Sequence, residues 1–495
     1  MSAFQNFLGI KLNSFDSGSL RVLIDRVENK IDQGRLNSAL HLIDNFVERI
    51  ITEPLCTAQV FGSHDLDRLC LLVGEKNISR LTFNQEVSLP FKSNKPRINY
   101  IISRFQKSGG HSRLLHDFIS AQPNKDHLIL STGAGGPSDE DSFTQIYRYV
   151  DNVYFMSAPK LCLQSRLTWL QTMLSVGRPE HVYLLNHHHD SVAVAAPVPE
   201  LELKCSFLHH GDHHLCLGVC MEHFAHVDFN PVSFHYCRNV LNIENNYLPL
   251  TFKDKHFLPI QSKFAAGGSL TTATVARSNK VEIPYYISYL DIVPKILKAT
   301  GGQHIHVGKL TPWALRHIRS EMRKNKVPED RLIYIEWTPS VWDFFQDYAV
   351  DVFISPFPYG AGLTLIEAMG AGVPVILHQH IYSRLLGGID LAYPEAFSWN
   401  EPEALLIHLS TLKPERLEFE SHLSRQRYEK FHRPELLSDF FNEPYSTRKP
   451  IPELIGEFKP RYDEWAAWME SQLSFSRLGF RLAYRIYRRL RRLLS

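Results

Sequence analysis

One segment, Asp351 to Leu377, constrains the fold of this chain more than any other stretch; it reads DVFISPFPYGAGLTLIEAMGAGVPVIL. It opens on an apolar run, Val352 to Ser355, which is typical of a strand buried on both faces. Prolines and glycines interrupt the run, a helical pattern begins at Leu363, and a second apolar run extends from Val373 to Leu377. This order predicts a strand, a loop, a helix and a second strand, which together make one unit of a parallel α/β sheet.

The loop of this segment lies where the carboxyl end of a strand meets the N-terminus of a helix. Backbone N–H groups and the positive end of the helix dipole favour an anionic ligand there, such as a diphosphate. Glu367 follows one turn into the helix, within reach of a neutral polyol such as ribose. The density of glycines and prolines exceeds what an ordinary βα turn demands, so we interpret the loop as a binding element.

The stretch FPYGAGLTLIEAMGAGVPVI resembles the donor-sugar motif of GT-B glycosyltransferases. Its FPY, glycine-rich loop, Thr364, acid at 367 and AGVPV are similar to the SPINDLY and O-linked N-acetylglucosamine transferase group, and GLTLIEAMGAGVPVI is similar to the group 1 retaining family. That family usually has two glutamates; Glu367 matches the second, whereas Tyr359 stands in the place of the first. The resemblance implies donor-binding roles for Tyr359, Gly360, Gly362, Thr364 and Glu367, and a retaining or an inverting outcome stays open.

The same resemblance implies an α/β fold of the GT-B kind, in which two Rossmann-like domains face a cleft. We expect an N-terminal helical extension over 1–85, an acceptor domain over 96–255, a nucleotide-sugar domain over 256–412, a helical return segment over 413–470 and a C-terminal amphipathic helix over 471–495. GT-B enzymes usually use no metal and no cofactor, with the nucleotide-diphosphate sugar as co-substrate. The chain has no DxD-type signature near the donor loop, which agrees with this expectation.

Upstream segments supply further donor-binding candidates. The stretch ARSNKVEIPYYISYLDIVPKIL resembles the segment in which the O-linked group places a lysine on the donor diphosphate, and Lys280 is the matching residue. An ammonium group there would stabilise the leaving diphosphate as charge develops on it. Lys309 is a second basic candidate, and Thr338 stands where such folds usually contact the base. For both lysines the alternative is a solvated surface position.

The loop after the first predicted strand, KSGGHSRLLHDF, resembles the glycine-rich entry loop of the acceptor-side domain. Gly109 and Gly110 would let a substrate approach the backbone at a helix N-terminus. His111 opens that helix and is a catalytic candidate. A tight βα turn without further function is the alternative.

Two histidine clusters stand out among 25 histidines: NHHHD (186–190) and LHHGDHHLCLGVCMEHFAH (208–226). Part of the second, HHGDHHLCLG, resembles an HxDHxxxLG-like element of bacterial sugar transferases, which implies that Asp212 and His213 contact the sugar or the reaction centre. Imidazole suits this role, because its ordinary pKa near 6.5 lets it accept or donate a proton. Hydrogen-bonded histidines without chemistry are one alternative. The other is a zinc site drawn from His209, His210, His213, His214, Cys216 and Cys220.

Length and composition indicate a large globular protein. The chain has 495 residues, of which 44% are hydrophobic and 21% charged. Its seven cysteines form no regular CxxC framework, which favours reduced thiols and a cytoplasmic setting. The N-terminal residues lack the pattern of a secretory signal, and no run reaches the roughly 20 apolar residues of a membrane span.

The positive net charge of the chain, +2, comes from its last twenty residues. They read SRLGFRLAYRIYRRLRRLLS and hold seven arginines and no acid. An apolar stripe at i, i+4 spacing is formed by Leu478, Leu482, Ile486 and Leu490. A helix of this kind binds a membrane interface by apolar burial and by attraction to anionic lipid. We therefore expect a cytoplasmic protein held at the inner face of the cell membrane by residues 476–495. A packed terminal helix is the alternative, and nucleic acid is disfavoured because nothing else supports base recognition.

These features together predict a glycosyltransferase that moves a sugar from a nucleotide-diphosphate donor to a glycan acceptor. The arginine-rich tail favours a lipid-linked surface polysaccharide of the lipopolysaccharide or capsule type. Resemblance to the O-linked group favours a protein O- or N-glycosyltransferase instead, and a non-catalytic GT-B scaffold that binds sugars is a third possibility. The presence of both Lys280 and Glu367 favours an enzyme.

Overall fold

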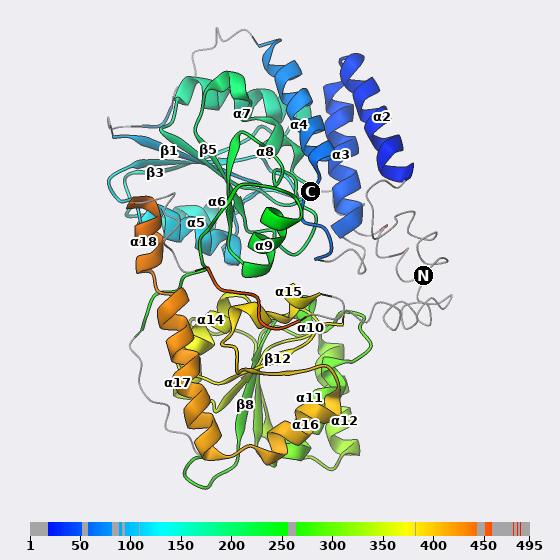
Figure 1. Ribbon diagram of the computed structural model, residues 1–495, viewed down its shortest axis with the longest axis vertical. Helices are drawn as coiled ribbons and strands as arrows, with labels where there is room; N and C mark the ends of the chain where they lie inside the picture. The colour runs from blue at the N-terminus through cyan, green and yellow to red at the C-terminus, as the bar shows by residue number, and fades with distance from the viewer. Residues whose placement is uncertain are drawn as a thin grey trace. The chain divides into compact units, whose positions relative to one another are not determined.

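The computed structural model describes residues 18–51, 58–81, 89–91, 95–107, 109–255, 264–381, 383–442 and 451–457, together with Gly479, Ala483 and Ile486. The described residues fall into two compact units (Figure 1). Unit 1 takes those of Met1–Phe229, Ser233–Tyr247 and Met469–Ser495, and unit 2 takes those of Asn230–Val232 and Leu248–Trp468. Each unit is built around its own parallel sheet.

The first helices among the described residues of unit 1 are α2 (Gly18–Asp32), α3 (Leu36–Ile51) and α4 (His64–Ile78). The apolar residues of α3 recur at helical spacing and are buried: Leu36, Leu40, Ile43 and Val47. Gly34, at φ +70°, makes the turn between α2 and α3. The side chain of Ser63 caps α4 by accepting a hydrogen bond from the N–H of Leu66.

The sheet of unit 1 has the strand order β3-β2-β1-β4-β5-β6-β7, and every pairing in it is parallel. Its strands are β1 (Arg97–Ile102), β2 (Asp126–Ser131), β3 (Val153–Ser157), β4 (His181–Leu185), β5 (Cys205–His209), β6 (Phe224–Asp228) and β7 (Asn245–Tyr247). Its helices are α5 (Gly110–Ser120), α6 (Glu140–Ile146), α7 (Leu163–Gly177), α8 (Ser191–Ala195), η2 (Pro199–Leu201) and α9 (Pro231–Asn239). The central strands are buried along their length, as expected where helices cover both faces.

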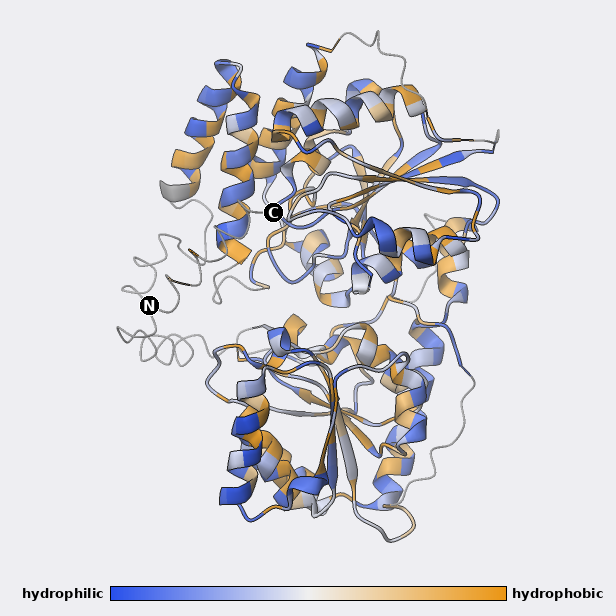
Figure 2. Cartoon of the chain, turned by 180° about the vertical axis from the view of Figure 1, so that it is seen from behind, coloured by the Kyte–Doolittle hydropathy of each residue, from blue (hydrophilic) through white to orange (hydrophobic). Residues whose placement is uncertain are grey.

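The sheet of unit 2 has the order β10-β9-β8-β11-β12-β13 and is also parallel. Its strands are β8 (Thr271–Val275), β9 (Gln303–Val307), β10 (Leu332–Ile335), β11 (Val352–Ile354), β12 (Val375–His378) and β13 (Phe397–Trp399). Its helices are α10 (Ser278–Val281), α11 (Tyr289–Thr300), α12 (Pro312–Lys324), η3 (Glu329–Arg331), α13 (Val341–Asp347), α14 (Leu363–Gly370), α15 (Arg384–Gly387), η4 (Ile389–Leu391) and α16 (Pro402–Thr411). The helices around both sheets mix hydrophobic and hydrophilic residues, as expected for elements with one buried side (Figure 2).

The strand, loop, helix and strand predicted for residues 351–377 are confirmed. Strands β11 and β12 are buried and pair in parallel, with Phe353 opposite Val375, and α14 connects them. The second strand begins at Val375 rather than at Val373. The reason is that the N–H groups of Gly372 and Val373 still bond to carbonyls of α14, so the turn takes two more residues than predicted.

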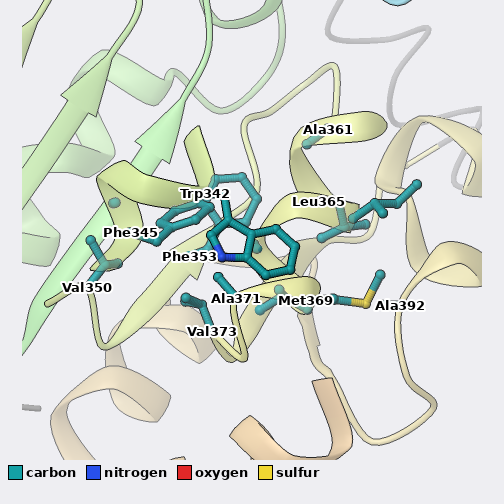
Figure 3. Close-up of a cluster of buried hydrophobic side chains, with 14 of the residues drawn as sticks. Trp342, Phe345, Val350, Phe353, Ala361, Leu365, Met369, Ala371, Val373 and Ala392 are labelled. Atoms are coloured by element: carbon teal, nitrogen blue, oxygen red, sulfur yellow. The ribbon is translucent and has the colours of Figure 1, made fainter. Parts of the chain in front are cut away.

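Trp342 of α13 lies at the centre of the apolar core that packs against β11, α14 and β12 (Figure 3). Its ring is fully buried among side chains that include Leu365 and Met369 of α14. A Cβ atom on Gly370 would lie 2.1 Å from Cζ3 of Trp342, so only glycine fits there without a shift of the ring. This packing holds α14, and therefore the loop at its N-terminus, in place.

Two helices follow the sheet of unit 2: α17 (Pro414–Phe431) and α18 (Glu435–Asn442). Tyr428 of α17 packs edge-on against Trp342, and its hydroxyl donates to the carbonyl of Phe252 at 2.8 Å. Among the described residues no helix is long and apolar enough to cross a membrane. The predicted C-terminal amphipathic helix lies outside the described residues, apart from Gly479, Ala483 and Ile486, which are helical.

Candidate functional site

Each sheet has one place where the strand order changes direction, and ligands of open parallel sheets bind at such a place, outside the carboxyl ends of the strands. It lies between β1 and β4 in unit 1 and between β8 and β11 in unit 2. Most candidate residues of the sequence analysis follow these strands or their direct neighbours. The strand order therefore gathers motifs that are far apart in the sequence.

In unit 2, Lys280 lies in α10, shortly after β8. Its Nζ atom donates a hydrogen bond of 2.7 Å to the carbonyl oxygen of Gly360, in the loop after β11. The N–H of Tyr359 in turn donates to the carbonyl oxygen of Lys280, at 3.4 Å. The structure thus brings together the lysine and the glycine-rich loop, which two separate motifs pointed to.

The electrostatic setting of Lys280 suits an anionic ligand. Burial lowers its pKa from the ordinary 10.5 to about 8, so the side chain still carries a positive charge at neutral pH. Charges interact more strongly where water is scarce, so this ammonium gains more from a diphosphate than a solvated lysine would. No acidic residue stands in the first turn of α14, which leaves the positive end of that helix without a carboxylate.

The glycine-rich loop after β11 is held on one side and open on the other. The N–H of Gly360 donates to the carbonyl oxygen of Leu386 at 2.8 Å, and a Cβ on Gly360 would lie only 2.4 Å from that oxygen. Gly362 is the N-cap of α14 and caps it with no side chain; a Cβ there would meet no atom within 4 Å. A ligand can therefore approach the backbone at the helix N-terminus, as glycines in such loops allow.

The remaining donor candidates take different positions in unit 2. Thr364 is partly buried in the first turn of α14, and Glu367, 9% exposed, lies three residues further on the same face. Lys309 is exposed after β9, and Thr338 follows β10, where its Oγ1 donates to the carbonyl of Ser340 at 3.0 Å. Trp337 was not among the residues predicted from the sequence. It is 69% exposed beside Thr338 and offers a flat apolar ring there.

A group of packed aromatic rings supports the start of the glycine-rich loop. Phe357 packs against Tyr289, His378 and Trp399, with ring centroids 5.7, 5.3 and 5.0 Å away. Burial lowers the pKa of His378 to about 3, so its imidazole is neutral, and it bonds to the hydroxyl of Tyr285 at 2.8 Å. These residues act on the loop through packing, and they belong to no local sequence pattern.

In unit 1 the histidines gather at the corresponding place. His111 lies in the first turn of α5, which follows β1, and the loops after β4 and β5 carry His187–His189 and His210–His214. The rings of His111 and His210 stack with centroids 4.8 Å apart, and those of His188 and His213 meet edge-on at 4.8 Å. His111, which the sequence placed in another motif, therefore joins both histidine clusters.

Most of these histidines are neutral. Burial, with the nearby rings of His210 and His187, holds the pKa of His111 well below its ordinary value. Burial also lowers the pKa of His210 to about 4 and that of His187 to about 3. The Nε2 atoms of His111 and His188 are buried and have no hydrogen-bond partner among the described residues. Neutral imidazoles of this kind can accept a proton or a hydrogen bond from a hydroxyl.

Asp212 and His213 lie at the more open side of this cluster. The His213 side chain is 44% exposed, and its Nδ1 atom is 3.9 Å from Oδ1 of Asp212. That distance is longer than a hydrogen bond. In the same unit Gly109 and Gly110 are exposed, and Gly109, at φ +132°, has open space where a Cβ would lie.

A buried carboxylate that the sequence analysis missed connects the loops. Asp190 accepts hydrogen bonds of 2.6 Å from the hydroxyls of Ser103 and Thr132, which follow β1 and β2, and one of 3.0 Å from the N–H of Ala193. Ser103 Oγ in turn accepts from the N–H of His187. The sequence does contain a pattern that indicates Asp190: it is the last residue of NHHHD and directly precedes α8, where an N-cap is expected.

The zinc set considered from the sequence is wrong as a set. Among the described residues, the ligand atoms close enough to hold a metal ion come from His209 together with His226, Asp228 and Cys237. Cys220 instead lies where its N–H bonds to the carboxylate of Asp67 in α4, at 2.7 Å, as does the N–H of Gly218. Adjacent residues in the loop after β5 point in different directions, which explains why the sequence neighbours do not converge.

No protein-family model and no curated protein sequence matches this chain. Solved structures do match its fold. HepE from Anabaena, crystallised with UDP and glucose, is 12% identical with a TM-score of 0.51, over 70% of this chain and 99% of that one. A glycosyltransferase from Rickettsia africae is 13% identical with a TM-score of 0.53, over 71% and 98%. TarM is 9% identical with a TM-score of 0.51, over 72% and 99%. These matches show that the chain has the GT-B fold, as its donor motif predicted.

Proposed function

We propose that this chain is a glycosyltransferase that moves a sugar from a nucleoside-diphosphate donor to a glycan acceptor. The observation that carries the proposal is the meeting of Lys280 with the Tyr359–Gly362 loop at the N-terminus of α14. A partly buried ammonium, an uncapped helix N-terminus and a glycine backbone are together suited to a diphosphate leaving group. HepE has the same fold and was crystallised with UDP and glucose, which supports this class of donor.

In this proposal unit 2 binds the donor and unit 1 supplies the residues for proton transfer. Unit 2 holds the donor, with Glu367 as the hydrogen-bond partner of the nucleotide ribose and with Lys280, the loop amides and the helix dipole on the diphosphate. Unit 1 supplies His213, with Asp212 beside it, to accept a proton from the acceptor hydroxyl, and His111 as a further catalytic candidate. Lys280, the loop amides and the helix dipole neutralise the diphosphate, so the donor reaction needs no metal ion.

The acceptor is the finer part of the proposal. We infer a lipid-linked surface glycan, because seven arginines and a leucine stripe in residues 476–495 suit attraction to an anionic membrane surface. The enzyme would then work on the inner face of the cell membrane. A protein acceptor, or a sugar-binding scaffold without turnover, would appear as a different outcome of the experiments below.

Replacing Glu367 with alanine is expected to weaken the binding of the nucleoside diphosphate by about 1.5–3 kcal/mol, the usual worth of a charge-assisted hydrogen bond. Isothermal titration calorimetry on the full chain measures this loss. Glu418→Ala removes an exposed carboxylate from α17 of the same unit and serves as the control, with unchanged affinity expected. If the folded Glu367→Ala protein bound the nucleotide as tightly as the control, Glu367 would have no role at the ribose.

Removing residues 476–495 is expected to release the protein from membranes while turnover on a short soluble acceptor stays nearly intact. Turnover on a lipid-linked acceptor should fall much further. Binding of the full chain to anionic vesicles should weaken with salt, since the Debye length drops from ~10 Å at 0.1 M to ~3 Å at 1 M.

Full-length protein with its seven tail arginines changed to glutamine is the control for charge. We expect it to lose vesicle binding as the truncated chain does. A truncated protein that still sediments with membranes would contradict the membrane role of the tail and remove the main support for a lipid-linked acceptor. The donor proposal would be unaffected, because its residues all lie in unit 2.

A further inference from the structure

Four buried side chains meet near the carboxyl ends of β5 and β6: His209, His226, Asp228 and Cys237. One ring nitrogen of each histidine, a carboxylate oxygen and the thiol sulfur lie within 4.8 Å of one another. The exposed fraction is 1% for His226 and 0% for the other three. The proposed function gives none of these residues a role, so the cluster needs an explanation of its own.

Sheet register brings the cluster together. His209 and Asp228 end their strands and are direct partners across the β5–β6 pair. His226 precedes Asp228 by two residues, so both side chains point to the same face of the sheet. Cys237 reaches that face from α9. The spacing along the chain matches no known metal motif, so the cluster could not be predicted from the sequence.

The distances are those of a small coordination sphere. Nδ1 of His209 lies 2.8 Å from Oδ1 of Asp228 and 3.9 Å from Sγ of Cys237. Nε2 of His226 lies 3.0 Å from Oδ2 of Asp228, within ion-pair distance but outside the geometry of an aligned hydrogen bond, and Nδ1 of His226 has no hydrogen-bond partner among the described residues. Ligand atoms around a tetrahedral Zn²⁺ with one sulfur are separated by about 3.3–3.5 Å, given Zn–N of about 2.0 Å and Zn–S of about 2.3 Å. The three distances above lie on both sides of that range, and no separation within the set exceeds 4.8 Å.

A second layer of hydrogen bonds orients the carboxylate. Nδ2 of Asn245 donates to Oδ2 of Asp228 at 2.6 Å and to the carbonyl oxygen of Phe234 at 2.9 Å. Nε of Arg238 donates to Oδ1 of Asn245 at 2.9 Å, which fixes the amide. Metal sites in proteins have supporting partners of this kind around their ligands.

Charge also favours a divalent ion here. A carboxylate, a thiolate and two neutral imidazoles around a dication sum to zero, so the filled site carries no net charge into the buried region. Without an ion, the cluster leaves His226 without an aligned hydrogen bond among the described residues, although its Nε2 lies 3.0 Å from Oδ2 of Asp228. We propose that His209, His226, Asp228 and Cys237 form a closed structural site for one divalent transition-metal ion of the zinc class. The site would connect β5, β6 and α9, and it is separate from donor binding.

The direct test is the metal content of the full chain purified from zinc-supplemented medium. Mass spectrometry of metals should find about one equivalent of zinc per chain. Chain stripped by a chelator should recover on addition of Zn²⁺ alone, with a rise in unfolding temperature of about 5 °C or more at 100 times the Kd. Co²⁺ added instead should give a thiolate-to-cobalt charge-transfer band and intense visible bands of tetrahedral cobalt. Protein without zinc, whose stripped form gives no such band with Co²⁺, would overturn the proposal.

Variants show which residues hold the ion. Cys237→Ser should abolish the thiolate band and remove most of the zinc, whereas Cys216→Ser, which changes a buried cysteine outside the cluster, should keep both. Asp228→Asn preserves the shape of the carboxylate and should lower zinc affinity at least about 10-fold. This variant replaces Cys237→Ser as the test if the serine variant does not fold. A thiolate band that survives Cys237→Ser, or that is lost in Cys216→Ser instead, would place the ion elsewhere and contradict the site proposed here.

Discussion

Replacing Lys280 with alanine is expected to lower kcat/KM for the nucleotide sugar by about 10²–10³-fold, the usual cost of removing one preorganised group that stabilises transition-state charge. Its Nζ atom already contacts the donor loop at Gly360, so a diphosphate in that loop lies within its reach. As the bond to the sugar breaks, negative charge grows on the diphosphate, and the ammonium stabilises that charge more than it stabilises the bound donor. Steady-state release of the nucleoside diphosphate measures the loss.

Lys298→Ala is the matched control, since Lys298 is an exposed lysine of α11 in the same unit, and its kcat/KM should stay within about twofold of wild type.

A pH series adds a second test of Lys280. The pKa of Lys280 is lowered to about 8, so the ammonium is present below that pH and is lost as the pH rises through it. Donor affinity of the wild type should therefore fall above pH 8, and the fall should disappear in Lys280→Arg, whose guanidinium stays charged. Equal rates for Lys280→Ala and the control would exclude a role in leaving-group stabilisation.

Changing His213 to alanine is expected to lower kcat by about 10²–10⁴-fold while the Kd of the nucleotide sugar stays nearly constant. The imidazole is 44% exposed at the open side of the histidine cluster, and the carboxylate of Asp212 stands 3.9 Å from it. The ring can take a proton from the acceptor hydroxyl as the new bond to the sugar forms. Because the effect concerns proton transfer, it should appear in turnover and not in donor binding.

His116→Ala is the control for the His213 experiment. His116 is an exposed histidine of α5 in the same unit, and its replacement should leave both constants unchanged. If His213→Ala lost donor affinity and kcat in the same proportion, the residue would serve binding rather than proton transfer. An unchanged kcat would leave His111 as the remaining catalytic candidate of the cluster.

The parts of the fold that could be predicted are those with a local pattern. Residues 351–377 carry two apolar runs, a glycine-rich turn and a helical period, and the structure has β11, α14 and β12 there. Lys280 was predicted through resemblance to a known motif, and the structure places it against the same loop. The functional roles of both remain predictions until the variants above are measured.

The parts that could not be predicted depend on strand order and register. His111 meets His210 because β1, β4 and β5 are neighbours in the sheet, and no local pattern states that order. The partners of His209 come from β6 and α9 through register, so the zinc set drawn from adjacent residues was wrong. The predicted membrane helix lies outside the described residues, and its role stays a proposal.

The central claim is that the loop at the N-terminus of α14, with Lys280, binds a nucleoside-diphosphate sugar. A panel of nucleotide sugars added to the full chain tests it most directly, with the unfolding temperature as the measurement. We expect at least one donor to stabilise the wild type by about 2.7 kcal/mol at 100 times its Kd, and the same concentration to stabilise Lys280→Ala much less. A panel in which no nucleotide sugar shifts the unfolding temperature, or in which the shift is the same for the Lys280→Ala protein, would contradict it.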